Sequence, residues 1–191
     1  MNSTAYDKIK NIPIISYDST GWNTLKAQFF SALAITHSIG VGAIQEHFLL
    51  KGNLYKLSKE FPGYGVFSIP AVKSNSAVSR GRPSCGLSII YKKELMKYTS
   101  HIQVPDSNRV QALKVKLPTE TFIFINAYFP TDPKVNNFNE GELHKTLQDI
   151  KYVFDKGNPN SKFILTGDVN ADVKRNTRFV QIVQNYITGN N

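Results

Sequence analysis

The sequence contains one cysteine, Cys85, and one tryptophan among its 191 residues. A single cysteine excludes an internal disulfide and any zinc module that is built on several cysteines. We therefore expect a protein of a reducing compartment inside the cell, with the nucleus as one location.

Long hydrophobic runs are also missing. The longest stretch without Asp, Glu, Lys or Arg covers residues 27–45, and it is interrupted by Gln28, Ser31, Thr36 and His37. A bilayer span needs about 20 mostly apolar residues. The N-terminal residues lack the apolar core of a signal peptide. Both absences predict a chain with no membrane partner.

Acidic residues are scarce relative to basic ones, and the imbalance is local. The chain has 23 Lys and Arg against 14 Asp and Glu, for a net charge of +9. Residues 51–116 carry 12 basic and 3 acidic side chains, whereas the segments on either side are neutral. An excess confined to one segment indicates either a basic face for a polyanion or a solvated surface that aids solubility.

The remaining composition is that of one globular domain. Hydrophobic residues make up 41% and charged residues 19% of the chain. These values exclude a disordered chain, a collagen-like repeat and a coiled coil. The length fits a single domain over residues 1–191.

Runs of β-branched and aromatic residues predict seven strands. They cover residues 12–17, 41–45, 64–69, 85–91, 110–117, 121–129 and 162–166. Residues 74–84 form a predicted loop. Strands that follow one another without helices favour a mixed α+β sandwich over a doubly wound parallel sheet.

Three helices are predicted from N-caps and apolar stripes. Asn23, Asn139 and Asn176 are the expected caps, and Glu142 completes a capping box with Asn139. The three expected inward stripes are Leu25, Phe29, Leu33 and His37; Leu143, Leu147, Ile150 and Phe154; and Phe179, Val183 and Tyr186.

Polar residues stand at the ends of several predicted strands. Glu46 follows the strand at 41–45, Tyr128 lies in the strand at 121–129, and Asp18 follows the first strand. Asp168 and Asn170 follow the strand at 162–166, and in extended geometry such a pair points to the same side. Oxygen ligands of this kind suit Mg²⁺ rather than zinc. Taken singly, a Glu at a strand end is usually a surface charge, a Gly-Asp pair is usually a turn, and a Tyr in a strand is usually a core side chain; the combination points to a site.

Five short segments together resemble the endonuclease/exonuclease/phosphatase superfamily, above all the endonuclease domains of non-LTR retrotransposons. The segments are Ser16-Tyr17-Asp18, Ile44-Gln45-Glu46-His47, residues 81–87, residues 126–130 and residues 166–171. The resemblance implies a deoxyribonuclease-like four-layer α/β/β/α sandwich with the active site at one rim.

The resemblance also implies roles for individual residues. Glu46 would bind Mg²⁺, or alternatively Mn²⁺, and Asp18 would be a second metal ligand where the family usually has Asn. Tyr128 would donate a hydrogen bond to the phosphate. Asp168 would orient or deprotonate the attacking water, and Asn170 would stabilise the transition state.

The chain departs from the family pattern in its terminal segment. Members of the family end with a Ser-Asp-His signature, and nothing after Asp172 matches it. We therefore expect a C-terminally incomplete domain that lacks the last strands of the fold. The same comparison places Cys85 where retroelement relatives commonly have Gly. His37 is expected in the core and His47 at the rim of the site.

The predicted function is Mg²⁺-dependent hydrolysis of DNA phosphodiester bonds, as in retroelement-type nicking. Arg80, Arg82 and Arg109 are the candidate phosphate contacts, and a reverse transcriptase is the expected downstream partner in the parent polypeptide. Two alternatives stay open. One is an inactive, truncated relative that only binds nucleic acid, and the other is a phosphatase or phospholipase of the same superfamily.

Overall fold

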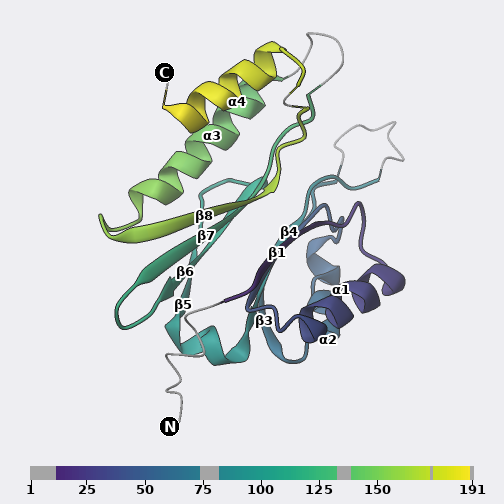
Figure 1. The fold of residues 1–191 in the computed structure, drawn as a ribbon. Helices are drawn as coiled ribbons and strands as arrows, with labels where there is room; N and C mark the ends of the chain where they lie inside the picture. Colours follow the sequence, from purple (N-terminus) through teal and green to yellow (C-terminus); the bar gives the residue numbers. More distant parts are fainter. Residues whose placement is uncertain (1–11, 74–81, 133–138, 173, 190–191) are drawn as a thin grey trace.

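The computed structural model describes residues 12–73, 82–132, 139–172 and 174–189, and it contains two four-stranded sheets packed face to face (Figure 1). The first sheet has the order β1-β2-β4-β3, with β1 and β2 parallel and the other pairs antiparallel. Its strands are β1 Ile14–Asp18, β2 Val41–Gln45, β3 Tyr64–Ile69 and β4 Leu87–Lys92.

The second sheet has the order β5-β6-β7-β8, with β7 and β8 parallel. Its strands are β5 Thr99–Ile102, β6 Val110–Lys116, β7 Thr121–Tyr128 and β8 Ser161–Asp168. The helices are α1 Thr24–Thr36, α2 Tyr55–Glu60, α3 Glu140–Asp155 and α4 Arg178–Thr188, and the 3₁₀ segments are η1 Lys51–Asn53 and η2 Lys93–Tyr98.

Three hydrophobic cores separate four layers. One core lies between α1, α2 and the first sheet, with Phe30, Ile44 and Ile90 fully buried. A second lies between the two sheets and includes Leu113 and Val115. The third lies between the second sheet and the pair α3 and α4. The structure is therefore an α/β/β/α sandwich, which confirms the predicted α+β class and layer order.

The strand predictions agree with the structure at most positions. Strands β2 and β3 have the predicted bounds, and the other predicted strands differ by one or two residues at one or both ends. Strand β5 and helix α2 were not predicted from the sequence. Most of the predicted loop at residues 74–84 lies outside the described residues.

Helix α1 begins as predicted but buries a different face. The Asn23 side chain accepts a hydrogen bond from the Lys26 backbone at 2.9 Å, as an N-cap does. The predicted inward stripe is wrong, because Phe29 is 57% exposed and His37 is exposed. The buried face consists of Ala27, Phe30 and Ala34.

The other two helices match their predicted stripes more closely. Asn139 caps α3 by accepting from the Glu142 backbone, and Leu143, Leu147 and Ile150 are buried. The cap of α4 is Thr177 rather than Asn176, since the Thr177 hydroxyl accepts from Val180. The cap lies one residue later than predicted because the Thr177 hydroxyl reaches the backbone N–H of Val180 in the first turn.

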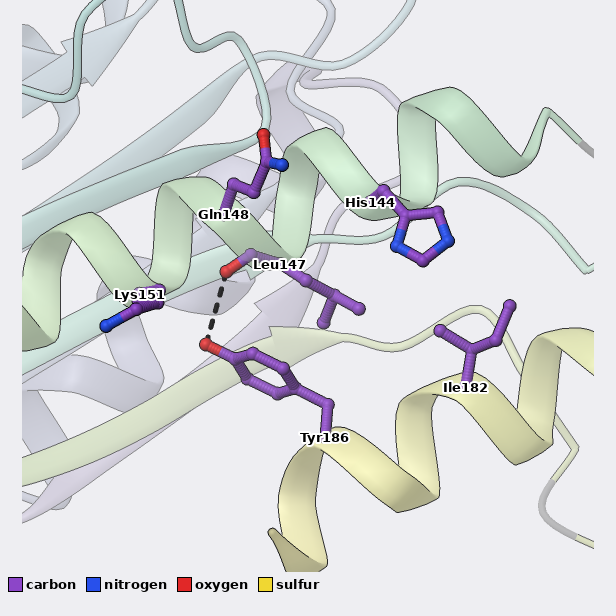
Figure 2. A pocket seen from close by; sticks show the side chains of 6 residues that line it. All are labelled: His144, Leu147, Gln148, Lys151, Ile182 and Tyr186. Atoms are coloured by element: carbon purple, nitrogen blue, oxygen red, sulfur yellow. Dashed lines mark hydrogen bonds between the residues drawn. The ribbon is translucent and has the colours of Figure 1, made fainter. Parts of the chain in front are cut away.

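Helices α3 and α4 also border a shallow cavity of about 190 Å³ on the outer surface (Figure 2). The Tyr186 hydroxyl crosses it to donate a hydrogen bond to the Leu147 carbonyl at 3.1 Å. Its lining residues are His144, Leu147, Gln148, Lys151, Ile182 and Tyr186. The cavity contains none of the residues predicted to form the site.

Candidate active site

The predicted site residues gather where strands of both sheets end. Glu46 follows β2 of the first sheet directly. Tyr128 ends β7 and Asp168 ends β8 of the second sheet, and these two residues are partners in the parallel ladder. Strand ends that are far apart in the sequence therefore meet at one rim of the sandwich.

A buried amide pair fixes the two sheets to each other beneath this rim. The Gln45 side chain donates to the Asn126 side-chain oxygen at 2.6 Å. Asn126 in turn donates to the carbonyls of Ile44 and Ser88, both at 3.1 Å. Buried polar groups need such partners, so these bonds specify how β7 lies against β2 and β4.

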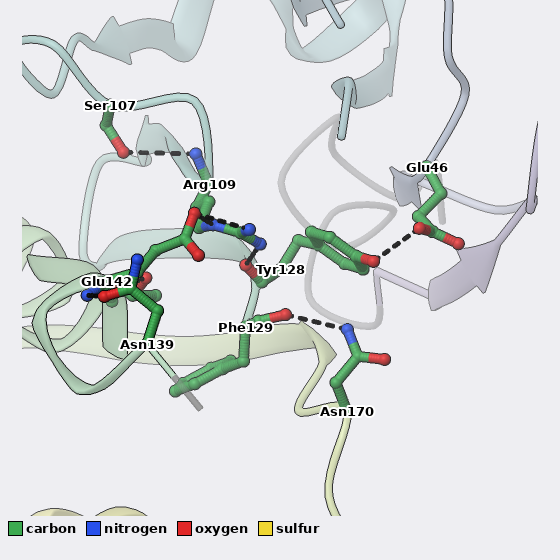
Figure 3. Close-up of polar contacts among 9 residues, drawn as sticks. Glu46, Ser107, Arg109, Tyr128, Phe129, Asn139, Glu142 and Asn170 are labelled. Atoms are coloured by element: carbon green, nitrogen blue, oxygen red, sulfur yellow. Dashed lines mark hydrogen bonds and ion pairs between the residues drawn. The ribbon is translucent and has the colours of Figure 1, made fainter. Parts of the chain in front are cut away.

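Tyr128 and Glu46 form the contact that joins the sheets at the rim itself (Figure 3). The Tyr128 hydroxyl donates to the Glu46 carboxylate at 2.5 Å. Burial of the ring, together with the neighbouring carboxylate, raises the pKa of the Tyr128 phenol, and the Asn170 amide opposes this rise. The phenol therefore stays protonated at neutral pH and remains a hydrogen-bond donor.

Asp168 and Asn170 converge through a turn rather than along a strand. The Asp168 carboxylate accepts a hydrogen bond from the Asn170 backbone at 2.8 Å, and Asn170 has a φ of 53°. The extended geometry predicted for this pair is therefore wrong, because the left-handed residue turns the chain. The Asn170 amide donates to the Phe129 carbonyl at 2.8 Å, as Figure 3 shows.

Gly167 explains why glycine precedes Asp168. A Cβ at this position would lie 1.8 Å from the Ala127 carbonyl oxygen, and Gly167 has a φ of 137°. Only glycine allows β8 to approach β7 so closely in this conformation. The glycine thus places Asp168 beside Tyr128.

Asp18 lies on the neighbouring strand but is turned toward its own loop. It is in register with Gln45, one residue before Glu46. Its exposed carboxylate accepts from the Thr20 backbone at 3.0 Å. Among the described residues, no three His, Cys, Asp or Glu side chains converge closely enough to hold a metal ion.

The donor set at the rim still fits Mg²⁺. Glu46 and Asp168 supply carboxylates and Asn170 an amide, and all three side chains are partly exposed. Mg²⁺ prefers oxygen ligands, retains several waters and needs only one or two protein carboxylates beside a substrate phosphate. Structural zinc sites usually have four Cys or His ligands, and no cluster of even three His, Cys, Asp or Glu is found in the described part of the chain.

The three candidate phosphate contacts differ in their surroundings. Arg109 is only 14% exposed and pairs with Glu142 at 2.7 Å, and its guanidinium lies 5.2 Å from the Tyr128 ring centre. Arg82 is exposed and lies over the Phe48 ring at 4.2 Å. Arg80 falls outside the described residues. Contact of these arginines with phosphate stays a prediction.

His47 does not line the rim, contrary to the sequence-based expectation. It is fully buried, its Nδ1 accepts from the Leu49 backbone at 2.9 Å, and its Nε2 faces the Leu87 carbonyl at 3.3 Å. Burial lowers the pKa of His47 to about 4, so the ring is neutral near pH 7. Its role is to fix the chain after Glu46.

Two features of the site have no clear signal in the sequence. Cys85 is buried and packs against Tyr128. Its φ of 62° is a conformation that glycine adopts readily, which explains why the family resemblance led us to expect glycine there. Phe48, which supports Arg82, resembles any apolar residue that follows a strand. Only the folded chain brings Phe48 and Arg82 together.

Several solved structures share the fold of this chain. The endonuclease domain of TRAS1, a telomere-specific non-LTR retrotransposon, matches with a TM-score of 0.63 and 16% identity over 93% of this chain and 71% of that one. An endonuclease/exonuclease/phosphatase family protein from Leptotrichia buccalis matches with a TM-score of 0.59 and 14% identity over 92% and 74% of the two chains. This chain has the endonuclease/exonuclease/phosphatase fold.

A third structure with the endonuclease/exonuclease/phosphatase fold is TDP2 from D. rerio, solved in complex with a single-stranded DNA product. It matches with a TM-score of 0.56 and 18% identity over 85% of this chain. The chain spans 62% of the length of that structure. No protein-family model and no curated protein sequence matches the chain.

Helices suited to a membrane are absent from the described ranges. Within residues 12–73, 82–132, 139–172 and 174–189, no helix has the length and apolar character needed to cross a bilayer.

The predicted nuclear location and the downstream reverse transcriptase stay predictions.

Proposed function

We propose that the chain is a divalent-metal-dependent endonuclease that hydrolyses DNA phosphodiester bonds in the manner of retroelement nicking enzymes. The observation that carries this proposal is the meeting of Glu46, Tyr128, Asp168 and Asn170 at one rim of the sandwich. A carboxylate for a metal, a protonated phenol and a second carboxylate beside an amide are the groups that phosphodiester hydrolysis requires.

Each residue has a separate task in this proposal. Glu46 would hold the metal, and Mg²⁺ at that place would supply positive charge beside the phosphate. Asp168 would accept the proton of the water that attacks phosphorus, and the leaving oxygen, whose bond to phosphorus breaks, would take a proton from solvent water. Its hydrogen bond from the Asn170 backbone fixes the direction of the carboxylate. With substrate bound, the Tyr128 hydroxyl would turn its one O–H from Glu46 to a phosphate oxygen. Asn170 would use the amide N–H that is not bonded to the Phe129 carbonyl. Both would act where negative charge grows in the transition state.

DNA is the favoured substrate because the basic residues are concentrated in one part of the chain. Residues 51–116 hold all of the net positive charge, and they include Arg82, which lies near the rim. The D. rerio TDP2 structure, which shares the fold, contains single-stranded DNA as a product. Binding through phosphate contacts should weaken steeply as salt rises.

The test is nicking of a supercoiled plasmid with Mg²⁺ and with EDTA. Wild type should nick only with the metal, and Glu46→Gln and Asp168→Asn should each lower the rate by about 10³-fold or more. Glu120→Gln is the matched control, because Glu120 pairs with Lys162 at the opposite end of β7 and β8. It should leave the rate unchanged.

The same assay separates the proposal from binding without cleavage. In the described part of the chain, no histidine joins the rim. His37 is the exposed C-cap of α1, and His47 is buried behind Glu46. His101 stacks on Phe67, and His144 lies on α3. An inactive relative would bind DNA in a salt-dependent way without nicking it. Nicking that Glu46→Gln and Asp168→Asn both retain would reject the proposed site.

A further inference from the structure

The guanidinium of Arg82 is stacked on an aromatic ring. A purely ionic contact with phosphate would not need such stacking. The Arg82 guanidinium carbon lies 4.2 Å from the centre of the Phe48 ring, so the two planar groups are in direct contact. Arg82 is exposed, and no acidic side chain of the described residues lies within ion-pairing distance of it. Arg109, by contrast, is neutralised by Glu142.

The Phe48 ring is fixed by the backbone around it. Its backbone N–H donates to the Cys85 carbonyl at 3.3 Å, and Phe48 has a φ of 55°. A Cβ on Gly21 would come within 3.0 Å of the ring. The Phe48 ring lies against Gly21 and also contacts Arg82. A ligand would therefore stack on the Arg82 guanidinium and not on the ring.

The Arg82–Phe48 pair lies beside the proposed metal ligand. Phe48 follows Glu46 by two positions, and two residues span at most about 7 Å of chain. The Phe48 backbone is also bonded to the Cys85 carbonyl, and Cys85 packs against Tyr128. Phe48 is therefore joined to both the Glu46 segment and the Tyr128 segment of the proposed site.

We infer that Arg82, supported by Phe48, is a stacking platform for an unpaired base that flanks the scissile phosphate. This inference rests on the proposed function and adds a substrate class to it. A guanidinium plane stacks on a base, whereas a lysine ammonium only attracts the phosphate. Bases inside a duplex are covered by their neighbours, so the platform favours single-stranded or locally unpaired DNA.

The test compares binding of a labelled single-stranded oligonucleotide with binding of the same sequence as a duplex, in EDTA so that no cleavage occurs. Arg82→Lys keeps the charge and removes the plane. It should weaken single-strand binding about tenfold, with little effect on the duplex. The slope of affinity against salt should not change, since the number of cations is the same.

Phe48→Leu and Arg178→Lys complete the experiment. Phe48→Leu keeps Arg82 but removes its support, so single-strand binding should fall in the same direction by a smaller factor. Arg178, an exposed arginine paired with Glu140 on the α3 and α4 side, is the matched control and should have no effect. Unchanged thermal unfolding should accompany both arginine variants.

The outcomes separate this inference from the proposed function. Equal single-strand affinity of wild type and Arg82→Lys would overturn the stacking platform while leaving the endonuclease proposal intact. Equal losses on single strand and duplex would also overturn it. If wild type binds with the expected preference but never nicks a plasmid, the platform stands and the endonuclease proposal fails. If wild type binds no DNA, both fail.

Discussion

Tyr128 links the two sheets through one hydroxyl group. Tyr128→Phe removes the bond to Glu46 and should lower the free energy of unfolding by about 1–3 kcal/mol, since the acceptor is charged. It should also reduce plasmid nicking by about 10²–10³-fold, because a preorganised donor is lost. Unfolding in urea and nicking rates measure the two effects.

Tyr186→Phe is the control for this prediction. Tyr186 also loses one hydrogen bond from its hydroxyl, to the Leu147 carbonyl, but it lies between α3 and α4. It should cost stability without changing nicking. Equal loss of nicking in both variants would mean that Tyr128 acts only through stability.

His47 should make the protein sensitive to mild acid. Its pKa is about 4 in the folded chain and about 6.5 when unfolded, so protonation favours unfolding. Its contribution to the free energy of unfolding is fully present above pH 6.5. Between pH 6.5 and pH 4 this contribution should fall by about 3 kcal/mol. Urea unfolding at several pH values measures the change.

His47→Asn should flatten this pH dependence, because asparagine does not titrate and its side-chain oxygen can accept from Leu49. His101→Asn is the control. Burial lowers the pKa of His101 as well, but this residue is exposed. The free energy of unfolding of His101→Asn should therefore still decrease with falling pH almost as much as that of wild type. If the free energy of unfolding depends on pH in the same way for wild type and His47→Asn, His47 is not the group that causes the acid sensitivity.

At the scale of elements, α1 offers two adjacent phenylalanines with opposite environments. Phe30 is fully buried against Phe61 and Ile44, and Phe29 is 57% exposed. Phe30→Ala should cost about 3–5 kcal/mol of stability, and Phe29→Ala less than about 1 kcal/mol. Urea unfolding of the two variants tests which face of α1 is buried. A larger loss of stability in Phe29→Ala would mean that the face predicted from the sequence is the buried one.

The same helix shows where sequence patterns lose information. Strands β2 and β3 were predicted with correct bounds because short apolar runs between turn residues have few alternatives. In helix α1, apolar residues lie on several sides, with Lys26, Gln28 and Ser31 between them, so spacing alone selected the wrong face. The short β5 has no alternation of apolar residues, and its pairing with β6 is visible only in the fold.

At the scale of the whole molecule, the site depends on how the sheets are set against each other. Glu46 belongs to the first sheet and Asp168 to the second, and Asn126 fixes the sheets through carbonyls of β2 and β4. Motif order predicted that these residues form one site, and the structure brings Glu46, Tyr128, Asp168 and Asn170 together.

The rest of the site could not be predicted, because it arises from contacts between distant segments. Arg109 was expected to face phosphate, yet α3 supplies Glu142 as its partner. His47 follows Glu46 in sequence, but the turn after β2 directs it inward. The Arg82–Phe48 pair joins two loops that no local pattern connects.

The most direct test of the account is a double-mutant cycle on single-turnover DNA cleavage with Mg²⁺. Glu46→Gln and Asp168→Asn should each slow cleavage by about 10³-fold or more, and the double variant should be little slower than the worse single variant, because the two groups act as one unit. Single variants that cleave at the wild-type rate, or losses that multiply in the double variant, would contradict a shared catalytic centre.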